Sequence, residues 1–295
     1  MSRPLSLVAL VTLGIGCIFA GRQAPRRGPE GPRWRALEAA RDADAARLTD
    51  AALAGDGGHE RDAATTRRPC PDGAVLIARS TFTMGRDDGA ADERPAHAVR
   101  LDAYCIDRTE ITVGAYTRCV TAGACTRPVA TPPEAEAPVS NIDWGQADAF
   151  CRYMGGRLPT EAEWELAARG TDGRRFPWGE TPPTGCEQID WSVNQESCHG
   201  VGPSPVGRHP AGASPFGLED MAGNVWEWTA DWYANSYSAD PSQNPSGPAS
   251  GSARVTRGGG WNNDQPERLS TTWRSGEHPA FRDYDLGARC AYTPD

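Results

Sequence analysis

The 295-residue sequence has no lysine, no Cys-x-x-Cys pair and no internal repeat. Its five histidines are scattered, so the ligand spacing of a zinc site is missing. Residues 70–295 carry 19 arginines against 31 acidic residues, and no arginine stripe with interleaved aromatic residues occurs there. Because an acidic body repels phosphate backbones, we expect no nucleic acid as a partner.

Glycine and proline are abundant. The 33 Gly and 25 Pro make up about a fifth of the chain, which is too much for a helical bundle and less than a low-complexity sequence carries. The length is sufficient for one large domain or two small ones with a sizeable core. The composition therefore predicts a globular domain in which much of the chain is loop.

The N-terminus has the features of an export signal. An apolar run over residues 5–20 follows Arg3; it is about as long as a signal-peptide core and short for a membrane span. We predict a signal peptide over residues 1–21. The segment ending at Cys17 is similar to a lipoprotein cleavage box, and the alternatives are ordinary cleavage near residue 20 or an uncleaved anchor. The expected location is exported and bacterial: periplasmic, membrane-tethered as a lipoprotein, or secreted.

Residues 22–69 are rich in Arg, Ala, Gly and Pro, and Trp34 is their only aromatic residue. Such a segment buries too little apolar surface to fold alone, so we predict a disordered linker. The folded domain is expected over residues 70–295.

Local patterns within this domain predict three helices. The first begins near Thr112; the second has Asp143 as its capping residue and the third has Thr160, and Gly123 and Gly170 end the first and third. Short strands are expected at 74–77, 81–84, 97–101, 225–229, 254–256 and 287–292.

Nine cysteines are present. With Cys17 set aside, eight remain, and an even number in an exported chain suggests disulfides, although eight cysteines allow 105 pairings. Short spacing favours two local bridges, Cys119–Cys125 and Cys186–Cys198.

Eight motifs follow one another through the predicted domain. They are FTMG at 82–85, DRTEIT at 107–112, PVSNIDW at 138–144, GGRLPTEAEWE at 155–165, FPWG at 176–179, GLEDMAGNVWEW at 217–228, RGGGW at 257–261 and LGARC at 286–290. In kind and order they resemble the formylglycine-generating enzyme family, or sulfatase-modifying factor domain. The resemblance implies an α+β, C-type-lectin-like fold with low regular secondary structure and several disulfides.

The family's enzymes use copper and oxygen to oxidise a sulfatase cysteine to formylglycine, and two cysteines bind the metal. The first follows the final Gly-Gly-small triplet by three residues and the second comes five residues later. Here the triplet ends at Gly260, and the two positions hold Asn263 and Arg268. Because Cu(I) needs soft thiolate ligands, the sequence predicts a variant without copper and without formylglycine synthesis.

The resemblance also implies the two remaining disulfides. Cys290 and Cys151 match cysteines that pair with each other in the family, which leaves Cys70 and Cys105 as a pair.

A structural calcium site is implied by the same resemblance. Its ligands correspond to Asp220, Gly223, Val225 and Glu227, a set of carboxylate and carbonyl oxygens that suits Ca²⁺. The alternative is an acidic turn in contact with solvent.

Two tryptophans, Trp226 and Trp261, are candidates to line a peptide groove with Asn263 and Arg268. The alternative is that they form part of the core, since large aromatic residues commonly fill loop-rich domains.

The predicted function is a calcium-stabilised binding or scaffold module for an unknown protein or peptide. One alternative is an oxidoreductase of the same superfamily that uses non-standard residues, such as an iron-dependent oxidase. Such relatives carry a histidine-rich iron site, whereas residues 22–69 contain a single histidine, His59. A further alternative to the binding module is a purely structural envelope protein.

Overall fold

The computed structural model describes residues 69–193 and 196–295. The predicted signal peptide at 1–21, Cys17 and the predicted linker up to residue 68 lie outside the described residues. Among the helices of the described part, none has the length and apolar character needed to cross a bilayer.

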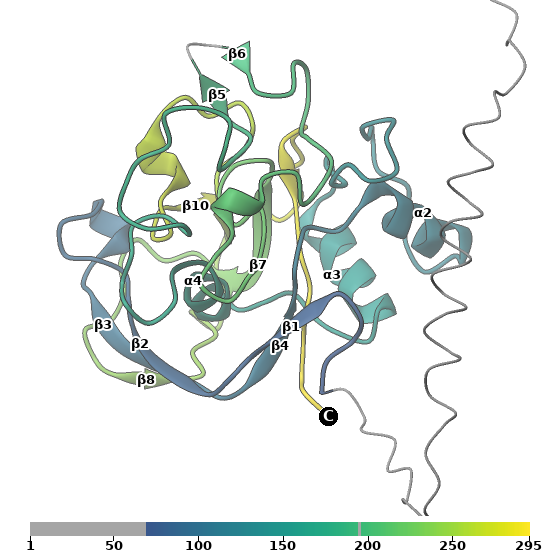
Figure 1. Ribbon diagram of the computed structural model, residues 1–295. Helices are drawn as coiled ribbons and strands as arrows, with labels where there is room; N and C mark the ends of the chain where they lie inside the picture. The colour runs from purple at the N-terminus through teal and green to yellow at the C-terminus, as the bar shows by residue number, and fades with distance from the viewer. Residues whose placement is uncertain (1–68, 194–195) are drawn as a thin grey trace, which may run out of the picture. The chain divides into compact units, whose positions relative to one another are not determined.

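The three predicted helices are present. They are α2 (Val113–Thr121), α3 (Trp144–Tyr153) and α4 (Glu161–Arg169). The side-chain oxygens of Thr112, Asp143 and Thr160 each accept a hydrogen bond from a backbone N–H of the first turn, which satisfies donors that a helix start leaves open. All residues of α4 are buried, and Figure 1 shows this helix in the middle of the domain, surrounded by strands.

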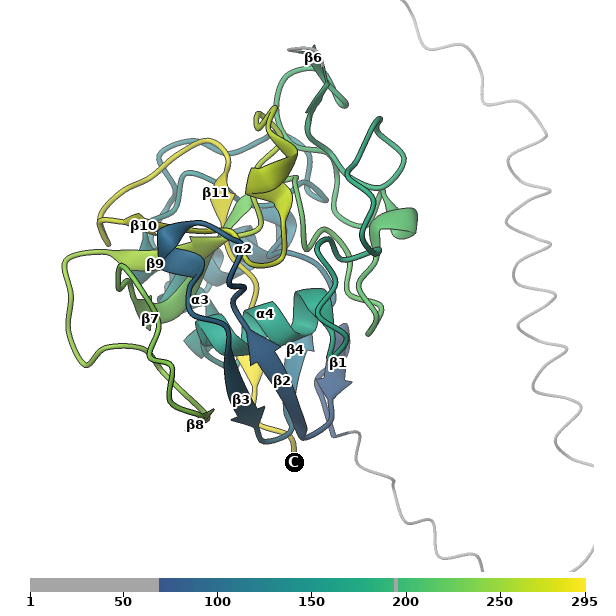
Figure 2. The same ribbon diagram turned by 90° about the vertical axis from the view of Figure 1, so that its left-hand side faces the viewer.

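The strands form small sheets around α4, as Figures 1 and 2 show. The first sheet has the strand order β1 (Ala74–Ile77), β4 (Tyr104–Asp107), β12 (Ala291–Tyr292), and the second has the order β10 (Arg274–Glu277), β9 (Arg254–Arg257), β7 (Trp226–Trp232), β11 (Leu286–Gly287). The third has the order β2 (Ser80–Met84), β3 (His97–Leu101), β8 (Ser242–Gln243). The fourth pairs β5 (Ser192–Val193) with β6 (Glu196–Ser197). Three short 3₁₀ helices complete the described elements: η1 (Ala91–Glu93), η2 (Pro210–Gly212) and η3 (Pro266–Leu269).

The single strand predicted over 287–292 is wrong, because that segment passes from one sheet to another. Leu286 and Gly287 pair with β7 as β11, whereas Ala291 and Tyr292 pair with β4 as β12. Between them, Arg289 extends its side chain into the interior, where none of it is exposed.

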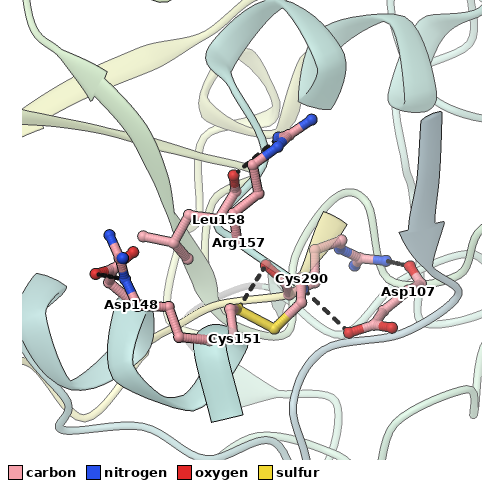
Figure 3. The surroundings of a disulfide bond; sticks show 8 residues. Asp107, Asp148, Cys151, Arg157, Leu158 and Cys290 are labelled. Atoms are coloured by element: carbon pink, nitrogen blue, oxygen red, sulfur yellow. Dashed lines mark hydrogen bonds and ion pairs between the residues drawn. A yellow bond between two sulfur atoms is a disulfide. The ribbon is translucent and has the colours of Figure 1, made fainter. Parts of the chain in front are cut away.

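All eight cysteines of the described residues form disulfides. The bonds are Cys70–Cys105, Cys119–Cys125, Cys151–Cys290 and Cys186–Cys198, which confirms the four predicted pairs. Figure 3 shows the bond from α3 to Cys290, whose backbone N–H donates to the Asp107 carboxylate at 3.1 Å. Four disulfides fit an oxidising compartment, as export requires.

Two large apolar clusters fill the domain. One joins α2 and α3 to Trp228 and the Cys151–Cys290 bond, and the other joins α4 to β2, β3 and β4. The segment from β9 to β11 has both buried and exposed residues, and it carries most of the site described next.

Candidate ligand-binding site

The two positions assigned by resemblance to copper-binding cysteines line a common cavity of about 250 Å³. Asn263 lies in the turn after β9 and Arg268 lies in η3. Trp226, the first residue of β7, forms a further part of the wall. Asn263 and Arg268 therefore border an open space and do not fill it.

Asn263 shapes this wall. Its side-chain oxygen accepts a hydrogen bond from the Gly260 N–H at 2.9 Å, and its own N–H donates to the Gly260 carbonyl at 3.0 Å. Its carbonyl accepts from the N–H of Ser192 at 2.9 Å, which ties the turn to β5. The side-chain amide thus supports the turn through the Gly260 N–H, and a thiolate at this position would lack that one contact.

Arg268 is exposed. Within the part of the chain that the structure describes, its guanidinium makes neither an ion pair nor a side-chain hydrogen bond. A free cation of this kind repels a metal ion and is available to a ligand.

Asp285 lies in the same cavity and is only 5% exposed. Burial, and after it the nearby Asp283, raises the pKa of its carboxyl to about 7, although hydrogen bonds from the backbone and from the Asn262 side chain act in the opposite direction. The sequence analysis missed this residue. The available signal was its place directly before the LGARC motif, which forms β11 beside Trp226.

Trp261 lies in a different, adjacent cavity of about 530 Å³. Its ring packs against Tyr284 with 5.6 Å between ring centroids, and the other walls include Pro132, Pro133 and Val201. The expectation of one groove containing all four candidates is therefore corrected: Trp226, Asn263 and Arg268 share one cavity, and Trp261 lines the other.

The cavity does not suit copper. Its side chains offer amide, guanidinium, hydroxyl and carboxylate groups, and every cysteine of the described residues is in a disulfide. Cu(I) requires soft sulfur donors, which these groups do not supply.

Two residues of the predicted calcium loop have positive φ angles. Asp220 adopts a positive φ of 57° and Gly223 one of 76°, and a Cβ on Gly223 would lie 2.3 Å from the Asp190 carbonyl. Val225 is fully buried beside them.

Glu227, the last predicted calcium ligand, is the partner of Arg289. Its two oxygens accept hydrogen bonds from Arg289 at 2.7 and 2.8 Å, and the Trp164 indole donates a third at 2.8 Å. A cation at Glu227 would have to share its two oxygens with these three donors. The structure thus places Glu227 in a buried ion pair, and the ligand role that the resemblance implied stays a prediction.

Asp220 faces a different carboxyl group. Asp220 and Glu110 interact with each other, and burial, together with this neighbour, raises the pKa of Glu110, while burial also raises that of Asp220. The Asn224 amide donates to one Glu110 oxygen at 3.0 Å, but the second Glu110 oxygen and the Asn224 oxygen have no hydrogen-bond partner although they are buried. These oxygens suit a hard cation such as calcium better than Glu227 does.

No group of three or more His, Cys, Asp or Glu side chains arranged to hold a metal ion occurs in residues 69–193 and 196–295. Any cation at Asp220 would therefore depend on amide or carbonyl oxygens as well.

Comparisons with known proteins agree with the motif analysis. The family model "Sulfatase-modifying factor enzyme 1-like domain" matches residues 59–294. The hercynine oxygenase of Mycobacterium tuberculosis is 32% identical over 259 residues, covering 72% of this chain and 59% of that protein, so the chain spans about three fifths of the oxygenase. The formylglycine-generating enzyme of Streptomyces coelicolor is 32% identical over 285 residues, covering 76% of this chain and 90% of the enzyme.

A solved structure, Treponema denticola variable protein 1, superimposes with a TM-score of 0.65 at 27% identity, covering 75% of this chain and 95% of that one. The fold is thus the α+β, C-type-lectin-like fold that the resemblance implied. The chain belongs to the formylglycine-generating enzyme, or sulfatase-modifying factor, family.

Proposed function

We propose that this protein is a binding or scaffold module of the family that makes no formylglycine. The observation that carries the proposal is the cavity at the copper positions, which is open, has no thiol and contains an unpaired arginine and a buried carboxyl group.

The ligand that we propose is a protein or peptide. Exposed large apolar side chains collect at the two cavities: Phe281 lines the first, and Val201 and Tyr284 line the second. Exposed apolar surface around concave sites is typical of protein-binding regions.

Panning of a phage-displayed random peptide library on the full chain tests the binding function. We expect enriched peptides whose binding is weakened by Trp226→Ala. Absence of enrichment, or enriched peptides that bind the Trp226→Ala variant equally well, would overturn the proposal.

The lack of oxidase activity is tested separately. The full chain is incubated with copper, oxygen and a peptide carrying a sulfatase motif, and the peptide is analysed by mass spectrometry. We expect no formylglycine, and its appearance would contradict the proposal. The double variant Asn263→Cys/Arg268→Cys is the matched control, and it is expected to bind Cu(I) in a chelator competition in which the natural chain does not.

We propose a structural role for calcium at Asp220, with Glu110 and Asn224 supplying further oxygens in place of Glu227. Support comes from the buried oxygens of Glu110 and Asn224 that lack partners. Calcium should raise the melting temperature relative to chelator, and Asp220→Ala should abolish that increase. An equal response of the two proteins to calcium would refute this assignment.

The proposed location is outside the cytoplasm: periplasmic, tethered through a lipid on Cys17, or secreted. The four disulfides support an oxidising compartment. Mass spectrometry of the mature N-terminus distinguishes a lipidated Cys17 from ordinary cleavage.

The second candidate function is an oxidoreductase of the same superfamily, and the similarity to hercynine oxygenase favours it. Metal analysis of the purified full chain separates the two: stoichiometric iron would support oxidase chemistry, and calcium without iron would support the binding module.

A further inference from the structure

The first cavity contains more acidic than basic side chains. Glu277, Asp283 and Asp285 line it together with a single cation, Arg268. Glu277 accepts a hydrogen bond from the Ser275 hydroxyl at 3.0 Å, and Asp283 accepts one from the backbone N–H of Tyr284 at 2.7 Å. None of these carboxylates forms an ion pair with Arg268 within the described residues.

Among the three acids, Asp285 is the most buried, which disfavours its ionised form. Its exposed fraction is only 5%, and the groups that lower the pKa of its carboxyl by hydrogen bonding are a backbone N–H and the Asn262 side chain. A carboxylate can accept about four hydrogen bonds. A buried carboxyl group with so few donors has unused acceptor capacity at the wall of an open cavity.

Gly260 makes room for this carboxyl group. A Cβ added at Gly260 would lie 2.6 Å from Asp285 Oδ2 and 3.0 Å from the Asp285 Cβ. Any larger residue at position 260 would therefore push the Asp285 side chain away. The Asp285 carboxyl group occupies the space that a side chain at position 260 would take. Gly260 and Asp285 thus form a matched pair that keeps an acid in the cavity.

The size and walls indicate what the acid could bind. A volume of about 250 Å³ falls below the range of about 300–1,000 Å³ that is usual for drug-sized ligands, so it suits a single side chain or small group. The Trp226 ring in the wall adds a surface that favours cations.

We propose that this cavity binds a guanidinium or ammonium group of the ligand, with the Asp285 carboxylate accepting its N–H groups and Trp226 packing against it. The proposal rests on the binding function proposed above and names the chemical group that the site selects. Arg268, the free cation at the same cavity, opposes such a ligand and limits its affinity.

The test uses N-acetyl-L-arginine amide as the probe and N-acetyl-L-citrulline amide as its neutral isostere, titrated into the full chain and followed by NMR chemical shifts. We expect the arginine compound to bind at least about tenfold more tightly than the citrulline compound, because charge-assisted hydrogen bonds are about twice as strong as neutral ones. Equal binding of the two compounds would overturn the proposal.

Three variants define the site. Asp285→Asn should weaken arginine binding by at least about tenfold. Gly260→Ser, which leaves the carboxyl group in the chain but displaces it, should have an effect in the same direction. Arg268→Gln should strengthen binding a few-fold because a like charge is removed. Asp240→Asn, an exposed acid at another cavity, is the matched control and should have no effect.

The outcomes separate this inference from the function on which it rests. If displayed peptides bind in a Trp226-dependent manner but contain no enriched lysine or arginine and tolerate Asp285→Asn, the cation site is refuted and the binding function stands. If Asp285→Asn leaves arginine binding unchanged while Trp226→Ala abolishes it, the assignment to Asp285 is wrong.

Discussion

Arginines lie in two contrasting regions of this molecule. In the interior, Arg289 is bound to Glu227 and Arg274 is bound to Glu161 through two N–H groups at 2.6 and 2.7 Å. At the cavity, Arg268 has no acidic partner although three acids line the same space. Removing charge from water is costly unless it is paired, so pairing in the interior is a condition of folding. Arg268 is exposed to water, so it needs no acidic partner for folding, and the acids around it are left for the ligand that we propose.

The interior pairs also shift the acidity of their carboxyl groups. Burial acts to raise the pKa of Glu161, but Arg274 and Arg257 outweigh it, and the pKa is lowered. Asp285, without an arginine partner, has a pKa raised to about 7. The difference teaches that a buried carboxyl group paired with arginines serves the structure, whereas one without an arginine partner is left for the binding that we propose.

The largest expected effect comes from loosening the segment that carries Arg289. Changing Cys151 and Cys290 together to Ala removes a bond that closes 139 residues, and loop entropy predicts a loss of about 5 kcal/mol in the free energy of unfolding. The same change at Cys119 and Cys125, which close 6 residues, should cost about 2 kcal/mol. Denaturant unfolding measures both, and a larger loss for the short bridge would contradict this order.

The second prediction breaks the interior pair. Arg289→Met leaves the Glu227 carboxylate buried without its partner, and we expect a loss of about 3–5 kcal/mol in unfolding free energy. The double variant Glu227→Leu/Arg289→Met removes both charges and should recover part of this loss. If the double variant is less stable than Arg289→Met alone, pairing is not the reason for the effect.

The third prediction concerns pH. Asp231 is buried; burial, and then Glu161, raises the pKa of its carboxyl group to about 7. Because this folded-state value exceeds that of the unfolded chain, the stabilising contribution of Asp231 is complete below about pH 4 and is lost as pH rises through 7. Asp231→Asn, which still accepts the hydrogen bond that the Glu161 N–H donates at 2.8 Å, should therefore gain stability relative to the natural chain as pH rises from about 4 to about 7, and the gain should stay constant above that.

The slope of that gain is at most about 1.4 kcal/mol per pH unit, the value for one proton. Thermal unfolding at a series of pH values measures it. Asp240→Asn, at an exposed acid, is the control and should show no such slope. A flat difference for Asp231→Asn would show that the carboxyl group is ionised throughout this range.

The smallest expected effect is at the cavity. Arg268→Gln should change the unfolding free energy by no more than about 0.5 kcal/mol, because an exposed side chain without a partner is lost. A loss comparable to that of Arg289→Met would remove the distinction between the two regions.

Sequence patterns predicted the parts of the fold that depend on neighbouring residues. Capping by Thr112, Asp143 and Thr160 is a local interaction, so the three helix starts were found. The motif order supplied the fold and, with cysteine spacing, the disulfides. The strand at 287–292 was misjudged because Arg289 enters the interior between two sheets, and this depends on Glu227, a residue 62 positions away.

The candidate site was predicted only in part for the same reason. Asn263 and Arg268 were identified from the family motif, but the division of the tryptophans between two cavities depends on how distant loops pack. The contact between Gly260 and Asp285 is a fit between segments that are separate in sequence, and no local pattern reports it.

The most direct test of the account is the ¹⁵N NMR spectrum of the tryptophan indole groups during titration with N-acetyl-L-arginine amide. The account predicts that the Trp226 signal shifts, that the signal of the buried Trp228 does not, and that the Trp226 shift is lost in Asp285→Asn. A Trp226 signal that does not move, or that moves equally in the Asp285→Asn variant, would contradict the claim that Asp285 and Trp226 bind the cationic group of the ligand.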